Sequence, residues 1–216
     1  MADKSEGDQL SDYHRRRDLE RTEEPRGRSH RSKESQGPVF VVQHHVATAD
    51  HYDLRLEVDG VLRSWAVPKG VSTDPRDKRL AMPTEDHPLD YAGFEGTIPG
   101  GEYGGGTVQI WDRGRYANTT RKDGRELSMA EGLEKGHVSV RLSGEKLSGG
   151  YALTRIRADG DGAWLLMKEK DEQADARRDP VSTQTESVAG GREPGEIAEQ
   201  DGRTLRGRSV EGDGTS

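Results

Sequence analysis

The stretch Gln43-His44-His45-Val46-Ala47-Thr48-Ala49-Asp50-His51-Tyr52-Asp53-Leu54-Arg55 holds three of the chain's seven histidines. From its second half onward, polar and apolar residues alternate, which is the pattern of a β-strand with one buried face. The apolar positions of this strand are Tyr52, Leu54, Leu56 and Val58. Its other face carries an imidazole, a carboxylate and a guanidinium, each two residues apart: His51, Asp53 and Arg55. We therefore predict a strand that presents chemically active side chains along one face.

These residue types indicate a metal site next to an anion-binding group. His51 and Asp53 are both metal-binding residue types, and His45 can complete the set from the preceding strand. Arg55 does not bind metals, but its guanidinium suits phosphate or carboxylate. An ordinary polar barrel face, with histidines satisfied by hydrogen bonds, is the alternative. The residue types alone leave both interpretations open.

The composition limits the class of protein. Of the 216 residues, those from 37 to 170 have the pattern of one globular domain with its own core. The chain has no cysteine, which excludes disulfides and thiolate metal sites. No apolar run approaches the length of a membrane span, and the charged start Met1-Ala2-Asp3-Lys4 does not look like a signal peptide. We expect a soluble cytoplasmic protein with no membrane partner.

The formal net charge of −7 is unusual for a protein that binds nucleic acid. Much of the acidic excess lies after residue 171, and the central region is close to neutral. This region therefore has no strong non-specific attraction for a polyanion. A role on nucleic acid requires a local cluster of basic side chains.

The two ends of the chain differ in composition from the centre. Residues 1–36 are highly charged and poor in aliphatic side chains, as in a disordered arm. The alternative is an arm that docks on the domain and adds Arg17, Asp18 and Glu24 to the site. Residues 171–216 are rich in Thr, Ser, Gly, Glu and Arg, and we predict a disordered tail. Three arginines within 203–208 hint only weakly at phosphate contact.

A tight hairpin is predicted at Asp59-Gly60, between two alternating segments. A two-residue turn there places Arg55 opposite Ser64 and Asp53 opposite Ala66. The active side chains would then lie opposite small ones, which leaves room for a ligand.

The rest of the central region contains further short strands and one helix. Ser128-Met129-Ala130-Glu131 is a capping box that opens a short helix ending at Gly136. Asp112-Arg113-Gly114 has the composition of a turn, and the glycine-rich segment 94–106 lacks the Lys and Ser or Thr of a P-loop. About eight strands are expected: 38–43, 51–58, 61–67, 78–85, 107–111, 137–142, 151–157 and 163–169. This pattern predicts a mainly β fold, a compact antiparallel β-barrel.

Several blocks of this sequence resemble the 3′-phosphoesterase module of bacterial DNA ligase D. They are 41–57, 59–70, Glu85-Asp86-His87-Pro88-Leu89-Asp90-Tyr91 and 94–104, in this order. The arm also resembles the N-terminal strip of this family, at Tyr13, Arg17-Asp18 and 22–25. His44 departs from the pattern, because the family usually has Lys at this position.

The resemblance implies a β-barrel enzyme that heals DNA 3′ ends in non-homologous end joining. Such a module removes a 3′-terminal ribonucleotide and then the 3′-phosphate, leaving a 3′-hydroxyl, and it uses manganese. Carried over, His45, His51 and Asp53 hold the metal. The resemblance also implies a catalytic and supporting set: Arg55, His87, Tyr91, Gln43, Lys69, Arg79, Glu85, Arg17, Asp18 and Glu24. Since 216 residues do not hold polymerase and ligase domains as well, we expect action in trans with a DNA ligase or polymerase and other end-joining factors.

Two other functions remain open at this point. A non-haem iron oxygenase uses a similar set of two histidines and one carboxylate, also on barrels. Against it, the second histidine usually lies far downstream, and Arg55 with Lys69 suits a polyanion better than dioxygen. A non-catalytic nucleic-acid-binding barrel is the second alternative. Against it, the chain has few aromatic residues to serve as exposed stacking platforms.

Overall fold

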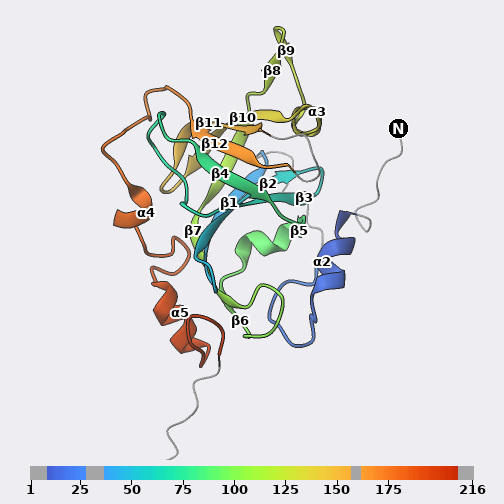
Figure 1. Ribbon diagram of the computed structural model, residues 1–216, viewed down its shortest axis with the longest axis vertical. Coiled ribbons are helices and arrows are strands. Elements are labelled where there is room, and N and C mark those ends of the chain that lie inside the picture. The colour runs from blue at the N-terminus through green and yellow to red at the C-terminus, as the bar shows by residue number, and fades with distance from the viewer. Residues whose placement is uncertain (1–8, 28–36, 157–161, 209–216) are drawn as a thin grey trace, which may run out of the picture.

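Eight antiparallel strands close into a barrel in the computed structural model, which describes residues 9–27, 37–156 and 162–208. Around the ring they are β1 (Val39–Val46), β2 (His51–Val58), β3 (Val61–Val67), β4 (Arg79–Pro83), β12 (Trp164–Lys168), β11 (Ser148–Arg155), β10 (His137–Gly144) and β7 (Gly106–Asn118). Pairing of β7 with β1 closes the ring. The predicted barrel of about eight strands is confirmed, and each expected strand supplies one of its members (Figure 1).

Smaller elements decorate the barrel. The strands β5 (His87–Pro88) and β6 (Gly96–Ile98) pair with β3 and β7, and β8 (Arg121–Lys122) forms a hairpin with β9 (Arg125–Glu126). The predicted helix is α3 (Met129–Lys135), with the Ser128 capping box and left-handed Gly136 both present. The described residues add α2 (Ser11–Arg16), the 3-10 turn η2 (Leu89–Gly93), α4 (Pro180–Thr183) and α5 (Pro194–Gln200). None of the helices in the described ranges is long and apolar enough to cross a membrane.

The hairpin between β2 and β3 has the predicted register. Asp59 and Gly60 both have positive φ, as a tight two-residue turn requires. Arg55 lies opposite Ser64, and Asp53 lies opposite Ala66. This local turn therefore sets which small residues face the active side chains of β2.

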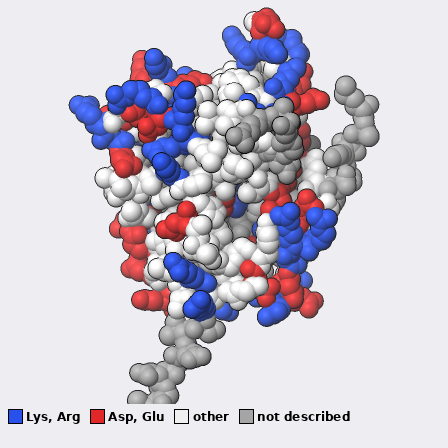
Figure 2. Space-filling view, in the orientation of Figure 1, with Lys and Arg blue, Asp and Glu red and all other residues white. Residues whose placement is uncertain are grey.

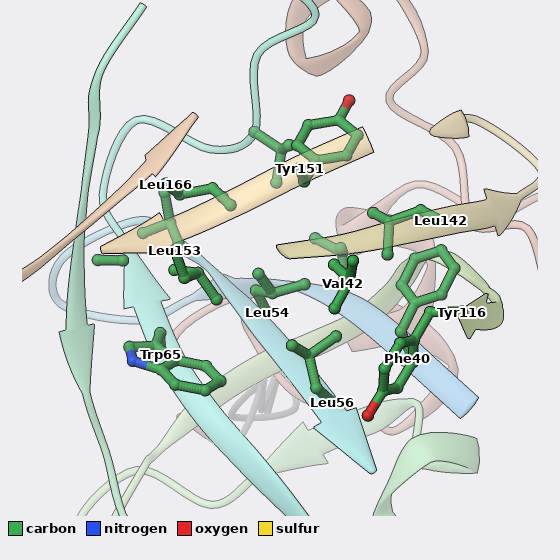
Figure 3. Packing of buried hydrophobic residues seen from close by; sticks show 14 of the residues in the cluster. Phe40, Val42, Leu54, Leu56, Trp65, Tyr116, Leu142, Tyr151, Leu153 and Leu166 are labelled. Atoms are coloured by element: carbon green, nitrogen blue, oxygen red, sulfur yellow. The ribbon is translucent and has the colours of Figure 1, made fainter. Parts of the chain in front are cut away.

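The interior of the barrel is filled with apolar side chains. Those of β2 meet side chains from β1, β3, β7, β10, β11 and β12 in one buried cluster. Figure 3 shows Phe40, Val42, Leu54 and Leu56 pointing toward Leu142 and Leu153. Because this packed core occupies the inside, the polar face of β2 is turned to the outside of the barrel.

A second layer covers that outer face. Its apolar cluster joins side chains from α2, η2, β3, β6 and β7: Leu10, Tyr13, Val61, Leu62, Leu89, Tyr91, Phe94, Ile98 and Val108. Figure 1 shows α2 beside β5, with the green turn η2 nearby. Asp53 and Arg55 are consequently buried. The sequence predicted one buried face for β2, whereas both faces are buried, and the polar face is enclosed between barrel and cover.

The predicted turn at Asp112-Arg113-Gly114 is wrong, because these residues continue β7. Asp112 is fully buried and its carboxylate accepts hydrogen bonds from the backbone N–H groups of Glu145, Lys146 and Leu147. Gly114 lies against the backbone of Ser143, where a side chain would clash. Asp112 and Gly114 are of residue types typical of turns, but here they allow a close contact between strands.

The prediction of a disordered tail is wrong for residues 171–208, which pack along the barrel. Buried side chains of β7 hold this segment by its backbone: Gln109 donates to the carbonyls of Thr185 and Arg192, and Trp111 Nε1 donates to Gln184. Ile197 of α5 is buried. The polar composition of this segment did not reveal the contact, because the contact depends on backbone groups and a few apolar side chains. Residues 1–8, 28–36 and 209–216 of the predicted arm and tail lie outside the described residues.

Candidate active site

Two imidazoles and one carboxylate meet where β1 and β2 pair. His45 lies directly opposite His51 in this pair, and Asp53 lies two residues further along β2. One ligand atom from each residue falls within a group whose members all lie within 4.8 Å of one another. The three side chains thus form a compact donor set with two nitrogens and one oxygen, as the alternation of β2 predicted.

The hydrogen bonds of these residues leave one possible metal-ligand atom of each residue facing the other two residues. His51 Nδ1 lies 2.9 Å from the carbonyl of Ala49, so Nδ1–H donates there and Nε2 keeps its lone pair. His45 has a hydrogen bond to the backbone of Gly104, and its Nε2 is buried without a hydrogen-bond partner. Burial lowers the pKa of His45 to about 4, which keeps the imidazole neutral. Imidazoles that are anchored through one ring nitrogen, with the other nitrogen turned toward the group, fit a divalent metal.

Arg55 lies next to this donor set and is almost fully buried. Its Nη2 donates to Asp53 Oδ2 at 2.9 Å, its Nε donates to Gln43 Oε1 at 2.7 Å, and its Nη1 donates to Ser64 Oγ at 2.9 Å. Gln43, which is fully buried, donates in turn to the carbonyls of Tyr91 and Phe94. The guanidinium therefore has a fixed orientation, and it links the carboxylate of the metal-ligand candidate Asp53 to the cover layer.

The N-terminal arm contributes a second buried guanidinium. Arg17 Nε donates to Glu24 Oε1 at 2.7 Å, and its Nη1 donates to Glu85 Oε1 at 2.9 Å. The side chains of Arg17, Glu24 and Glu85 are only 4%, 0% and 5% exposed. The hydroxyl of Tyr91 donates to the same oxygen of Glu24. The arm thus docks on the barrel through a buried ion-pair network.

His87 lies between the two guanidiniums. Its Nδ1 lies 2.9 Å from the carbonyl of Glu85 and 2.9 Å from Arg55 Nη1, and its Nε2 lies 3.1 Å from Arg17 Nη2. Burial, and then the charges of Arg55 and Arg17, hold the pKa of His87 well below its usual range. A neutral imidazole has one acceptor nitrogen, so it either accepts from Arg17 at Nε2 while Nδ1 donates to Glu85, or accepts from Arg55 at Nδ1.

Most of these groups border one cleft of about 190 Å³ on the outer face of the barrel. Of the residues predicted from the sequence, eight line it: Arg17, His45, His51, Asp53, Arg55, Glu85, His87 and Tyr91. Gln43 and Glu24 support the cleft from behind through their hydrogen bonds to Arg55, Arg17 and Tyr91. Two imidazoles, a carboxylate and two guanidiniums can together hold a cation and an anion side by side.

Three predicted residues are not brought to the cleft. Lys69 is exposed in the turn after β3. Arg79 pairs with Asp77 at 2.8 Å at the start of β4. Asp18 is exposed and accepts a hydrogen bond from the backbone of Glu20. Their assignment to the catalytic group stays a prediction.

Sequence reasoning did not name two parts of the cleft that come from the glycine-rich segment. Tyr103 lines the cleft, and its hydroxyl donates to Glu85 Oε2 at 3.2 Å and accepts from Arg16 Nη1 at 2.7 Å. Gly104 anchors His45 by its backbone. The only available signal was the position of Tyr103 among glycines, since backbone contacts leave no trace in residue type. Figure 2 shows that Lys and Arg side chains gather over α2, beside the hollow in the centre of this face.

Comparison with known proteins supports the resemblance of these motifs. Residues 43–155 match the family described as the DNA ligase D 3′-phosphoesterase domain. The chain is 53% identical over 167 residues to the multifunctional non-homologous end joining protein LigD of Pseudomonas aeruginosa, which is 76% of this chain and 19% of that protein. It is 44% identical over 172 residues to the multifunctional non-homologous end joining DNA repair protein LigD of Mycobacterium tuberculosis, which is 80% of this chain and 22% of that protein.

The chain spans about a fifth of the length of these relatives. The matched region includes the three metal-ligand candidates together with Arg55, His87 and the glycine-rich segment. The resemblance predicted from the motifs is therefore confirmed, and the chain belongs to the family of the DNA ligase D 3′-phosphoesterase domain.

Proposed function

We propose that this protein is a manganese-dependent phosphoesterase that heals DNA 3′ ends. It removes a 3′-terminal ribonucleotide and then the 3′-phosphate, leaving a 3′-hydroxyl for end joining and ligation. One observation carries the proposal: the donor set of His45, His51 and Asp53 shares a small cleft with the guanidiniums of Arg17 and Arg55. A phosphate ester needs both kinds of group, because negative charge must be neutralised on its oxygens during hydrolysis.

The donor set fits a divalent cation without thiolate ligands. His45 Nε2 is buried and unpaired, and Asp53 Oδ1 lies 3.7 Å from His51 Nε2 while Oδ2 is occupied by Arg55. Two imidazoles and one carboxylate leave further coordination positions open. When bound there, a manganese ion supplies Lewis-acid polarisation of the phosphate and activation of water at neutral pH.

Arg55 and Arg17 orient the phosphate and offset its charge. The contacts of Arg55 with Gln43, Ser64, Asp53 and His87 still leave one of its five N–H groups for an oxygen in the cleft. Both guanidiniums are held by buried partners before any substrate arrives. They therefore need little reorganisation during the reaction, which is the condition for strong electrostatic stabilisation.

In this proposal His87 lies between the two arginines and aligns them, rather than supplying a proton to the leaving group. Burial, and then the charges of Arg55 and Arg17, hold the pKa of His87 well below its usual range, which favours the neutral imidazole. Its single acceptor nitrogen can take a hydrogen bond from one guanidinium, from Arg17 at Nε2 or from Arg55 at Nδ1. Tyr91 stays protonated, because burial raises its pKa well above the usual range, and its hydroxyl positions Glu24.

A primer with a 3′-phosphate provides the direct test. The protein should release phosphate in the presence of manganese, lose this activity on exhaustive chelation, and regain it when manganese is added back. Asp53→Asn should abolish it, whereas Asp123→Asn, at an exposed turn far from the cleft, should not. Release of phosphate at the full rate by metal-free protein would refute the proposal.

The two alternative functions have less support. An oxygenase gains nothing from two guanidiniums beside its ligands, and these groups favour an anionic substrate over dioxygen. A non-catalytic barrel does not account for a buried, unpaired imidazole nitrogen beside a carboxylate. In our proposal the partners are DNA or RNA-containing primer 3′ ends, with a DNA ligase or polymerase and other end-joining factors acting in trans.

A further inference from the structure

A second pocket of about 720 Å³ adjoins the metal-ligand candidates. His45 and His51 line both this pocket and the cleft. Its other walls are the 47–49 loop and the glycine-rich segment, where Gly100, Gly101, Gly104 and Gly105 leave it open. Its far wall carries Arg206 and Arg208, from a segment that lies some fifty residues beyond the region that defines the family.

The segment 203–208, here named the C-terminal strap, is fixed to the glycine-rich segment by backbone contacts. The N–H of Gly100 donates to the carbonyl of Gly207 at 2.7 Å, and the N–H and hydroxyl of Thr107 both donate to the carbonyl of Leu205. Gly207 has φ +75°, and a side chain there would clash with the backbone of Ile98 and Gly100. The strap therefore holds a defined position at the rim of the pocket.

Arg206 and Arg208 flank this anchored glycine, and both are exposed. Within the ranges that the structure describes, neither guanidinium has a hydrogen-bond, ion-pair or ring partner. By contrast, Arg192, which precedes α5, pairs with Glu95 at 2.7 Å. Figure 2 shows basic side chains at the lower edge of the molecule, over α5 and the segment after it. Two unpaired guanidiniums in an acidic segment suggest that their partner is a ligand.

We propose that Arg206 and Arg208 form a second phosphate-binding subsite, which takes the backbone of the nucleic-acid strand whose 3′ end lies in the cleft. This inference rests on the proposed function. The cleft itself accommodates little more than a terminal phosphate and sugar, so the rest of the strand must leave through an opening. The pocket that shares His45 and His51 with the cleft provides this path, and guanidiniums at its end suit successive phosphodiester groups.

The test compares the double variant Arg206→Ala/Arg208→Ala with the wild type. Binding of a 3′-phosphorylated primer, measured by fluorescence anisotropy in chelator without metal, should weaken by about 3- to 30-fold at low salt, because each exposed charge pair contributes modestly. The slope of log affinity against log salt should decrease by about 0.7 for each phosphate of a single strand that the variant no longer neutralises. Michaelis constants should rise on long primers far more than on nitrophenyl phosphate.

A matched control removes two exposed charges elsewhere. Lys122→Ala/Arg141→Ala changes the net charge equally on β8 and β10, at the opposite end of the molecule from α5 in Figure 1. This control should bind and turn over like the wild type. Equal binding by the strap variant and the wild type, or equal weakening in the control, would overturn the subsite. A wild type without phosphatase activity would defeat the proposed function, while the metal-free binding measurement still decides the subsite.

Discussion

Arg55 Nη2 donates a hydrogen bond to Asp53 Oδ2 at 2.9 Å, and this bond ties the half of the cleft that carries the guanidiniums to the half that carries the metal-ligand candidates. Oδ1, the other oxygen of Asp53, is left facing His51 Nε2 at 3.7 Å. The side chains of Arg55 and Asp53 are only 4% and 8% exposed. The guanidinium therefore orients a metal-ligand candidate, and in the proposed function it also contacts the phosphate.

Replacement of Arg55 should affect both halves. We expect Arg55→Ala to lower turnover about 10- to 1,000-fold and to weaken manganese binding about tenfold or more, because removal of a partner that orients a ligand typically has this effect. Arg55→Lys should restore little, since an ammonium cannot bond to Gln43, Ser64 and Asp53 together. Phosphatase assays and metal titration by calorimetry measure the two effects. Arg63→Ala, on the exposed side of β3, is the control, and unchanged metal affinity in Arg55→Ala would contradict this account.

The docked arm should be essential for the cleft. Arg17→Ala leaves the buried carboxylates of Glu24 and Glu85 without their guanidinium, and breaking such a pair typically costs about 3–5 kcal/mol. We expect at least a tenfold loss of activity and faster hydrogen exchange in residues 9–27. Adding Glu24→Gln should recover part of the stability but not the activity.

Arg15→Ala provides the comparison for the arm, because Arg15 is 71% exposed and pairs with Asp12 on the surface. Its activity and exchange rates should match those of the wild type. If Arg17→Ala behaved like Arg15→Ala, the buried network would have no role in the site.

The buried state of His87 predicts a dependence of stability on pH. Its pKa is lower in the folded protein than the value of about 6.5 expected when unfolded, so the unfolded chain binds a proton that the native state excludes. The contribution is therefore fully present above pH 6.5 and is lost as the pH falls, by at most about 1.4 kcal/mol per pH unit. His87→Gln should flatten the decline in unfolding free energy between pH 7 and 5.5. Urea titrations of metal-free protein measure this, and parallel curves for both proteins would contradict it.

Substitution of His87 also distinguishes between two roles for this residue in the reaction, alignment of the arginines and donation of a proton. If it aligns the arginines, His87→Ala should slow hydrolysis of a DNA 3′-phosphate and of nitrophenyl phosphate by a similar factor. A proton donor would matter far less for nitrophenol, because this leaving group departs without a proton. A much larger loss on DNA than on nitrophenyl phosphate would therefore show that His87 donates a proton.

The C-terminal segment should stabilise the barrel. Ile197 is 1% exposed, and truncation of such a side chain typically costs about 2–5 kcal/mol. Ile197→Ala should thus lower the midpoint of thermal unfolding by several degrees. Leu205→Ala, at a position that is 40% exposed, should have little effect. Equal midpoints for Ile197→Ala and the wild type would show that α5 does not stabilise the fold.

The sequence by itself determined the parts of this protein that depend on local patterns. Alternation along β2 placed His51, Asp53 and Arg55 on one face, because successive side chains of a strand point to opposite sides. Asp59-Gly60 set the register with β3, since its positive φ angles fit a two-residue turn. The same reasoning found all eight barrel strands, although it ended β7 too early, at Asp112-Arg113-Gly114.

Only the tertiary structure decided what lies on top of that face. Periodicity shows which residues share a side of a strand, but not which distant segment covers it. Arg17 and Glu24 are buried because the arm docks, although its composition is typical of a disordered segment. The ion pair with Glu85 and the contacts of Tyr13 offset the conformational entropy that the arm loses on docking. Likewise, the strap with Arg206 and Arg208 is held by backbone hydrogen bonds to Gly100 and Thr107, and such bonds are independent of side-chain identity.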